Sequence, residues 1–220
     1  MKKGVILYHN NIQKLYDNRW IDKCIHSMVN QTDNDFTFYE LNYNGDSNSV
    51  VKNNSQKLKF WSKKMSNYAE AMNFLLDKSF NDGCDYVFNT NLDDYYALNR
   101  ISSQLDMMLE QDLDIVSSDF SYIQERKENG ISEDVVILFK NIEKNNIKDN
   151  LMKRHNVIAH PSVCYNKRFW LDNNNRYDIN KVPQEDLDLW IRSINNGYKF
   201  GIHEKVLLYY RIHEKQSSQS

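Results

Sequence analysis

The chain has 220 residues and a mass of 26.3 kDa, and its 28 Lys and Arg against 30 Asp and Glu leave a formal net charge of -2. This length suits one domain with a single sizeable core, and the composition is that of a globular protein. The balanced charge excludes nucleic-acid binding as the main task, and no apolar run reaches the ~20 residues of a membrane span.

Short apolar runs alternate with amphipathic segments in the first half of the chain. In chain order they predict a strand at Gly4–Tyr8, a helix at Trp20–Gln31 capped by Asp17 or Asn18, a strand at Phe36–Leu41, a helix at Tyr68–Ser79, a strand at Asp85–Asn89, a helix at Ile101–Gln111 and a strand at Asp114–Ser118. This alternation predicts the α/β class with a mainly parallel central sheet.

The second half is predicted to contain a strand at Val135–Phe139, a polar helix at Asn141–Asn156, a helix at Gln184–Asn196 followed by Gly197, and a strand at Val206–Tyr210. We find no internal repeat and no linker, so we predict one domain over residues 1–220. The first residues lack a signal-peptide pattern, and Cys24, Cys84 and Cys164 match neither a disulfide framework nor a zinc pattern. A reduced, cytoplasmic setting is expected.

Two adjacent acids, Asp93 and Asp94, follow the predicted strand at Asp85–Asn89. The carboxyl ends of strands are where open α/β sheets bind ligands. Because adjacent carboxylates repel each other, a divalent cation that bridges them to substrate phosphates is one interpretation. The alternative is that both acids cap the next helix.

Two further segments carry groups suited to catalysis. Glu185 and Asp186 stand at a predicted helix start, where they either complement the helix dipole or supply a general base. Arg211 and His213 share one face of the last strand, which suits a diphosphate or a metal, or simply a solvated edge. His160 and the aromatic Phe169 and Trp170 could meet a sugar face or belong to the core. The glycine-rich phosphate loops of nucleotide hydrolases and Rossmann enzymes are absent from the sequence.

Taken in order, these segments resemble the family 2 glycosyltransferases. The similar motifs are the first strand and turn at Val5–Asn11, the Ser-to-Gln-Thr helix end at Ser27–Thr32, the acidic motif at Asn91–Asp94, the Glu-Asp-x-x-Leu-Trp motif at Glu185–Trp190, and the Tyr-Arg-x-His ending at Tyr210–His213 with Ser217 or Ser218 downstream. The resemblance implies the GT-A fold, a three-layer α/β sandwich. It also implies a nucleotide-sugar donor, a Mn²⁺ or Mg²⁺ ion and transfer with inversion to a hydroxyl of a glycan or protein acceptor.

The resemblance also implies roles for individual residues. Asp186 would be the base, with Glu185 beside it, and Asp93 and His213 would hold the metal. The nucleotide sugar would be bound by Tyr8, His9, Asn10, Asn42, Asn44, Asn91, Asp93, Asp94 and Arg211. The acceptor would be contacted by His160, Trp170 and Trp190. The nucleotide-sugar half would span about residues 1–98 and the acceptor-binding, catalytic half about residues 99–220.

Amides replace acids at two places of the family pattern. Asn42 and Asn44 stand where the family carries an Asp-Asp-Gly-Ser turn, and Asn91 stands at the first acid of the metal motif. These changes leave open a catalytically inactive nucleotide-sugar or glycan-binding protein of the same fold, and more remotely a nucleotidyltransferase. The short chain with 29 Asn also resembles the glycosyltransferases of large DNA viruses, which would place it in a host cytoplasm.

Overall fold

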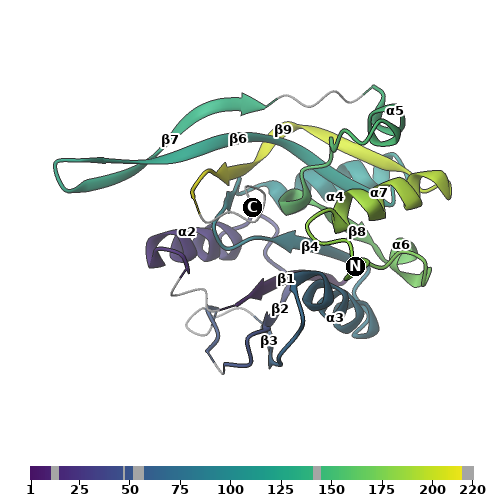
Figure 1. The fold of residues 1–220 in the computed structure, drawn as a ribbon, viewed down its shortest axis with the longest axis horizontal. Coiled ribbons are helices and arrows are strands. Elements are labelled where there is room, and N and C mark those ends of the chain that lie inside the picture. Colours follow the sequence, from purple (N-terminus) through teal and green to yellow (C-terminus); the bar gives the residue numbers. More distant parts are fainter. Residues whose placement is uncertain (11–14, 47, 52–56, 141–144, 215–220) are drawn as a thin grey trace.

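The computed structural model describes residues 1–10, 15–46, 48–51, 57–140 and 145–214 (Figure 1). Its strands are β1 (Lys3–His9), β2 (Thr37–Asn42), β3 (Lys57–Ser62), β4 (Tyr86–Thr90), β5 (Tyr95–Tyr96), β6 (Ile115–Glu128), β7 (Ile131–Lys140), β8 (Cys164–Asn166) and β9 (Phe200–Arg211). Its helices are α2 (Asn18–Val29), α3 (Tyr68–Asn81), α4 (Arg100–Glu110), α5 (Ile147–Met152), α6 (Lys167–Leu171) and α7 (Glu185–Asn195), with a 3-10 turn η1 at His160–Ser162.

The strands form one mixed sheet in the order β3-β2-β1-β4-β8-β6-β9-β5. The strands β3, β2, β1 and β4 run parallel, β8 is antiparallel to both of its neighbours, and β6 and β9 are parallel again. The register pairs His9 of β1 with Asn42 of β2, and Leu7 of β1 with Thr90 of β4. The carboxyl ends of these three strands therefore meet at one edge of the sheet.

Helices cover both faces of the sheet, because side chains of successive strand residues point to opposite faces. On β1, Val5 and Leu7 enter the core beneath α2 and α4, whereas Ile6 enters the core beneath α3, α6 and α7. The fold is thus a three-layer α/β sandwich, and the predicted fold class is confirmed.

Local signals place most helix ends as expected. The Asp17 carboxylate accepts a hydrogen bond from the backbone N–H of Arg19, so Asp17 is the N-cap of α2. Gly197, with a φ of 87°, follows the last residues of α7 in the left-handed conformation that glycine adopts easily. Among the described residues no helix is long and apolar enough to span a bilayer.

Several elements differ from the predictions. The polar helix expected at Asn141–Asn156 is confirmed only in part: the described part of this stretch is helical at Ile147–Met152 alone, and residues 141–144 lie outside the described residues. The sequence reading missed β3, although Leu58 and Phe60 alternate there with lysines, and it missed the short β5, β8 and α6. Ser217 and Ser218 also lie outside the described residues.

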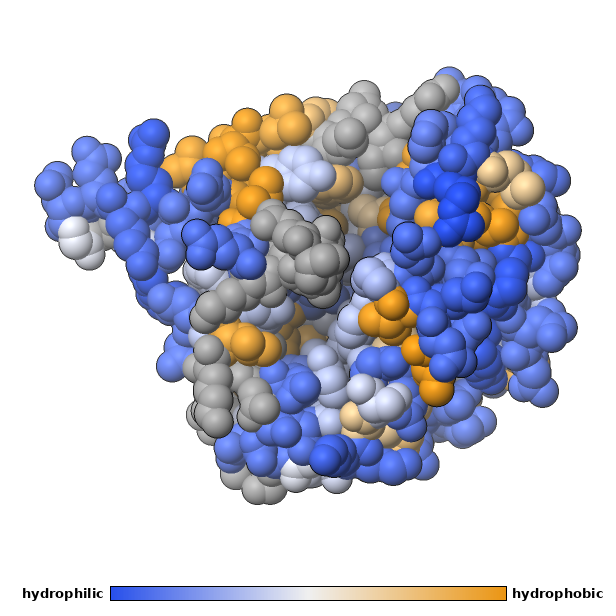
Figure 2. Space-filling model, viewed as in Figure 1, coloured by the Kyte–Doolittle hydropathy of each residue, from blue (hydrophilic) through white to orange (hydrophobic). Residues whose placement is uncertain are grey.

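The strands β6 and β7 form a hairpin that extends well beyond the helices (Figure 1). Its two-residue turn is Asn129–Gly130, with φ values of 52° and 79°. A two-residue Asn-Gly turn with positive φ at both positions matches the twist of a hairpin. Apolar side chains gather along β7 near the base of the hairpin, where residues 136–139 are each about half exposed (Figure 2).

Candidate active site

A cleft of about 350 Å³ opens at the carboxyl edge of the sheet. Its walls come from the end of β1, the segment after β4, the turn η1, the start of α7 and the end of β9. Of the residues predicted for the site it brings together Tyr8, His9, Asn10, Asn91, Asp93, His160, Glu185 and Asp186. Groups predicted to bind the donor and groups predicted to act on the acceptor therefore line one cavity.

The turn after β1 presents unsatisfied polar atoms at the cleft. The buried His9 contacts Glu40 through its Nε2 at 2.9 Å from Oε1, and the buried Glu40 also accepts the backbone N–H of Val50. His9 Nδ1 and Asn10 Oδ1 are buried without a hydrogen-bond partner among the described residues. Because such atoms are costly to leave unpaired, this turn is suited to accept hydrogen bonds from a ligand.

Asn91 is fixed where the cleft meets the end of β4. Its side-chain oxygen accepts a hydrogen bond from the Tyr8 hydroxyl at 3.0 Å, and its backbone N–H donates to the Tyr96 hydroxyl at 2.8 Å. The amide thus holds a defined position at the cleft without a charge.

Asn42 and Asn44 do not line the cleft, contrary to the predicted donor contact. The side chain of Asn42 is buried and accepts the backbone N–H of Asn44 at 3.2 Å, which closes a local turn. The Asn44 amide donates to Asp46 at 2.7 Å. Turn formation explains the amide of Asn42, because asparagine commonly bonds the backbone two residues on.

Asp93 and His213, far apart in the chain, are in contact. Asp93 Oδ2 lies 3.0 Å from His213 Nε2, and the rings of Tyr16 and Trp20 pack against the imidazole. Asp93 lines the cleft, so its carboxylate is available to a ligand. This is the pair that the resemblance assigns to the metal.

Asp94 is buried behind Asp93 and does not line the cleft. It accepts the backbone N–H of Arg211 at 2.8 Å through Oδ1, while Oδ2 has no partner among the described residues. Burial, and after it the charge of Asp93, raise the pKa of Asp94 well above its usual range. A direct contact of Asp94 with the donor is therefore not supported by its position.

Arg211 also lies away from the cleft, because its guanidinium is engaged inside the protein. Its Nε donates to the backbone carbonyl of Asp93 at 2.9 Å, and its two terminal nitrogens pair with Asp134 of β7. The side chain is only 1% exposed and packs over the ring of Trp20. The predicted donor contact of Arg211 is replaced by a structural one.

The donor set at Asp93 and His213 fits a divalent cation that also binds phosphate. Among the described residues no group of three His, Cys, Asp or Glu side chains could hold a metal together. One carboxylate and one imidazole are nevertheless present, and Mg²⁺ in particular takes few protein ligands when substrate phosphates complete its shell. The residues present therefore fit an ion that enters with a diphosphate.

The first turn of α7 carries the second pair of acids. Glu185 is 3% exposed and accepts a hydrogen bond from the Tyr68 hydroxyl at 3.1 Å. Burial above all raises its pKa to about 7, and the charge of Asp186 adds to that rise. Asp186 accepts hydrogen bonds from the side chain of Asn156 at 2.8 Å and from the backbone N–H of Leu187 at 2.6 Å.

His160 stands beside this pair. Its Nε2 lies 3.0 Å from the Tyr177 hydroxyl, and burial lowers its pKa although the charge of Asp186 partly opposes this shift. The lowered pKa favours the uncharged imidazole, which can both donate and accept a hydrogen bond at the cleft.

Trp170 and Trp190 do not reach the cleft. Trp170 is buried on α6, where its indole N–H donates to Asp77 at 2.7 Å and its ring stacks on Phe80. Trp190 is fully buried behind His160, with its ring 6.0 Å from the imidazole. The predicted acceptor contacts of both indoles are corrected to core packing, because α6 and α7 bury their apolar faces against the sheet.

Sequence reasoning missed the aromatic part of the cleft. Its walls include Tyr16, Tyr43, Tyr68 and Tyr210, together with Leu15 and Pro183. These residues come from separate loops and element ends, so no spacing in the sequence links them. Of these residues only Tyr210 belongs to a motif found in the sequence, the Tyr-Arg-x-His ending at Tyr210–His213.

Comparisons with known proteins indicate the class of enzyme. No protein-family model matches the chain. It is 27% identical over 215 residues to the O-antigen biosynthesis glycosyltransferase WbnJ of Escherichia coli, covering 93% of this chain and 79% of that protein. It is 28% identical over 208 residues to an uncharacterized glycosyltransferase of Methanocaldococcus jannaschii, covering 88% of this chain and 66% of that protein. Both relatives are glycosyltransferases by name, in agreement with the predicted enzyme class.

A solved structure shares the fold. The S. aureus TarS structure in complex with UDP-GlcNAc superposes with a TM-score of 0.72 at 16% sequence identity. It covers the whole of this chain, which spans about three fifths (61%) of the TarS chain. At this identity the likeness shows the fold. The two sequence relatives come from a bacterium and an archaeon, so they do not support the expected likeness to viral enzymes.

Proposed function

We propose that the chain is a family 2-type glycosyltransferase that moves a sugar from a nucleotide-sugar donor to a hydroxyl of a glycan or protein acceptor, with inversion at the anomeric carbon. The observation that carries this proposal is the single cleft lined by Asp93, which contacts His213, and by Glu185 and Asp186. Asp93 and His213 suit a diphosphate leaving group, and Glu185 and Asp186 suit an acceptor hydroxyl. The two relatives named as glycosyltransferases support the same reaction class.

The donor is proposed to lie along the carboxyl ends of β1 and β4. The unsatisfied His9 Nδ1 and Asn10 Oδ1 suit the hydrogen-bonding edge of a base or the hydroxyls of a ribose. Asn91 offers an amide to the ribose or sugar. A UDP-sugar is the first candidate, because the TarS structure of the same fold contains UDP-GlcNAc, and a GDP-sugar is the second.

We propose that Asp93 and His213 hold Mn²⁺ or Mg²⁺ together with the donor diphosphate. When bound, such an ion offsets the negative charge that develops on the departing nucleoside diphosphate. Asp93 has the accessible carboxylate of the acidic motif, and His213 is oriented by the rings of Tyr16 and Trp20.

Asp186 is proposed as the general base. It lies at the cleft, and hydrogen bonds from Asn156 and Leu187 fix its carboxylate. A positioned carboxylate that takes the proton of the acceptor hydroxyl makes this weak nucleophile reactive. A single base is sufficient for direct displacement, which is consistent with inversion. Glu185, with a pKa of about 7, carries a proton in much of the population at neutral pH and holds the Tyr68 hydroxyl by a hydrogen bond.

Replacing Asp186 by Asn tests the assignment of the base. Asp186→Asn keeps the shape of the side chain but cannot take a proton, so we expect kcat to fall about 10²-fold or more. Release of nucleoside diphosphate and of glycosylated product is measured over a panel of UDP- and GDP-sugars with Mn²⁺. The matched control is Glu185→Gln one residue away, for which a smaller loss is expected. Full turnover by Asp186→Asn would show that the base is another group.

A protein that binds nucleotide sugars without catalysis is the second candidate, favoured by the amide at Asn91. The two functions are separated by a thermal unfolding series with UDP-GlcNAc and Mn²⁺, because binding to the folded state raises the midpoint. A raised midpoint without product from any donor and acceptor would favour the binding protein. Release of pyrophosphate instead of nucleoside diphosphate would identify a nucleotidyltransferase. A cytoplasmic location stays a prediction.

A further inference from the structure

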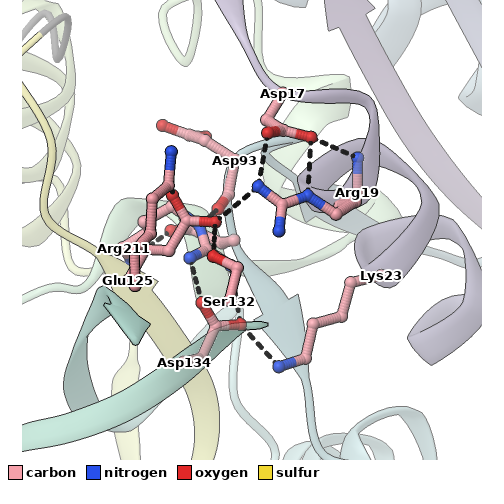
Figure 3. Close-up of polar contacts among 10 residues, drawn as sticks. Asp17, Arg19, Lys23, Asp93, Glu125, Ser132, Asp134 and Arg211 are labelled. Carbon is pink, nitrogen blue, oxygen red and sulfur yellow. Dashed lines mark hydrogen bonds and ion pairs between the residues drawn. The ribbon is translucent and has the colours of Figure 1, made fainter. Parts of the chain in front are cut away.

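The β6–β7 hairpin is tied to the donor end of the cleft by a network of charged side chains (Figure 3). Two acids of the hairpin, Glu125 on β6 and Asp134 on β7, point inward from the two strands. Glu125 pairs with Arg19 near the start of α2 at 2.8 Å, and it accepts the Ser132 hydroxyl across the hairpin. Asp134 pairs with Arg211 and with Lys23 of α2.

The contact of Asp134 with Arg211 is the buried one in this network. The side chain of Arg211 is 1% exposed and that of Asp134 is 8% exposed, whereas those of Arg19 and Lys23 are both more than 40% exposed. The guanidinium meets both carboxylate oxygens, which is the two-bond geometry that arginine forms best. Removing one partner of such a buried pair leaves the other charge uncompensated, while exposed pairs contribute little.

Arg211 also contacts the acidic motif that carries Asp93, one of the two predicted metal ligands. Its Nε donates to the carbonyl of Asp93, and its backbone N–H donates to the carboxylate of Asp94. His213 follows two residues later and contacts the Asp93 carboxylate. One arginine therefore connects the acidic motif after β4 with the end of β9, and Asp134 is a carboxylate partner of that arginine.

We propose that Asp134 is a positioning residue for the metal and diphosphate end of the site. Resting on the proposed function, this inference assigns the hairpin a role in donor binding: Asp134 neutralises and orients Arg211, which holds Asp93 and the segment carrying His213 in register. Side chains that orient metal ligands without touching the metal typically affect metal affinity by 10- to 100-fold.

The proposal is tested by Mn²⁺ binding in the presence of UDP, followed by the electron paramagnetic resonance signal of free Mn²⁺. We expect Asp134→Asn to weaken Mn²⁺ binding about tenfold or more, because the amide removes the negative charge and one of the two acceptor oxygens that face the guanidinium of Arg211. The matched control is Glu133→Gln on the neighbouring, exposed position of β7, for which wild-type affinity is expected. A second control, Lys23→Met, removes the exposed partner of Asp134 and leaves the buried pair.

Kinetics give an independent readout. We expect the KM for the nucleotide sugar to rise in Asp134→Asn more than kcat falls, because the base Asp186 lies at another part of the cleft. If Asp134→Asn does not fold, Asp134→Glu decides, since it keeps the charge but moves the carboxylate by one methylene. Weakened Mn²⁺ binding by this variant supports the proposal.

The outcomes separate this inference from the proposed function. If wild-type protein neither binds Mn²⁺ with UDP nor releases nucleoside diphosphate, the proposed function fails and the inference falls with it. If wild-type protein binds Mn²⁺ with UDP and a folded Asp134 variant binds it equally well, only the role of Asp134 is overturned.

Discussion

Glu185 shows how the fold changes the chemistry of a single residue. As the first residue of α7, an acid there would ordinarily complement the helix dipole in its charged form. In this chain burial outweighs that effect and raises the pKa of Glu185 to about 7. The carboxyl group is thus available in both protonation states near neutral pH, next to the proposed base.

The raised pKa of Glu185 predicts a pH dependence of stability. Between about pH 4.5 and pH 7 the folded state keeps a proton that the unfolded chain has lost, so the contribution of Glu185 to the free energy of unfolding falls as pH rises through this interval. The fall is at most about 3 kcal/mol for a shift of this size.

Urea unfolding of the wild type and of Glu185→Gln at pH 5 and pH 7.5 measures this effect. The uncharged amide has no proton to lose, so the variant should gain stability relative to the wild type at the higher pH. Parallel pH profiles for the two proteins would contradict the pKa of Glu185.

Sequence patterns identified individual residues better than their roles. Asp93, Glu185 and Asp186 line one cleft and His213 contacts Asp93, while the roles that the motifs predict for them stay predictions. The role of Arg211 could not be predicted in the same way, because its partner Asp134 lies 77 positions away in a hairpin that no motif connects to it. A motif shows that a positively charged side chain is needed at a position. It does not show whether that side chain faces a ligand or an internal carboxylate.

At the scale of the element, α4 lies close to β9 because of Gly201. A Cβ at this position would overlap Leu113 Cδ1 and come within 2.9 Å of Met107 Cε. The residue pairs with Val116 near the start of the β6–β9 ladder, and its neighbours on both sides are also paired, so the strand has little freedom to move away.

Gly201→Ala is therefore expected to destabilise the fold by about 1 kcal/mol, the lower end of the usual cost of overpacking, because the two atoms that must shift are the ends of flexible side chains. Chemical denaturation measures the loss. In the double variant Gly201→Ala/Leu113→Val the two costs should not add, because the smaller side chain makes room for the new methyl group. Strict additivity would show that contact with Leu113 is not the cause.

Helices and strands could be predicted from the sequence where capping and turn residues are clear and apolar residues recur with a single helical or strand period. The central strands and the helices α2, α3, α4 and α7 were identified, while β8 has three residues and carries too little pattern to detect. The β6–β7 hairpin was recognised only in part, although Asn129–Gly130 is a strong turn signal. Its strands are mostly exposed and polar toward the tip, so hydrophobic periodicity indicates them poorly.

At the scale of the whole molecule, the sheet separates two hydrophobic cores. Ile6 of β1 belongs to the core under α3, α6 and α7, and Ile101 of α4 belongs to the core under α2 and α4. Because the backbone of the sheet lies between them, the two cores should respond independently to changes in packing.

Ile6→Val and Ile101→Val test this independence. Each change should cost about 0.5–1.5 kcal/mol, and the double variant should lose the sum within about 0.5 kcal/mol. The comparison pair is Ile21→Val with Ile25→Val, two neighbours one turn apart in the same core, for which coupling is expected. Equal coupling in both pairs, measured by urea unfolding, would mean that strain crosses the sheet.

The tyrosines of the cleft have a practical consequence. Tyr8, Tyr16, Tyr43, Tyr68 and Tyr210 line a single cavity, so whatever enters it will rest against phenol rings. Rings held rigidly in an asymmetric environment give near-ultraviolet circular dichroism, and a ligand seated among them alters that spectrum. The circular dichroism of these tyrosines therefore reports ligand binding directly. It allows unlabelled candidate donors and acceptors to be ranked by affinity before any product has been identified.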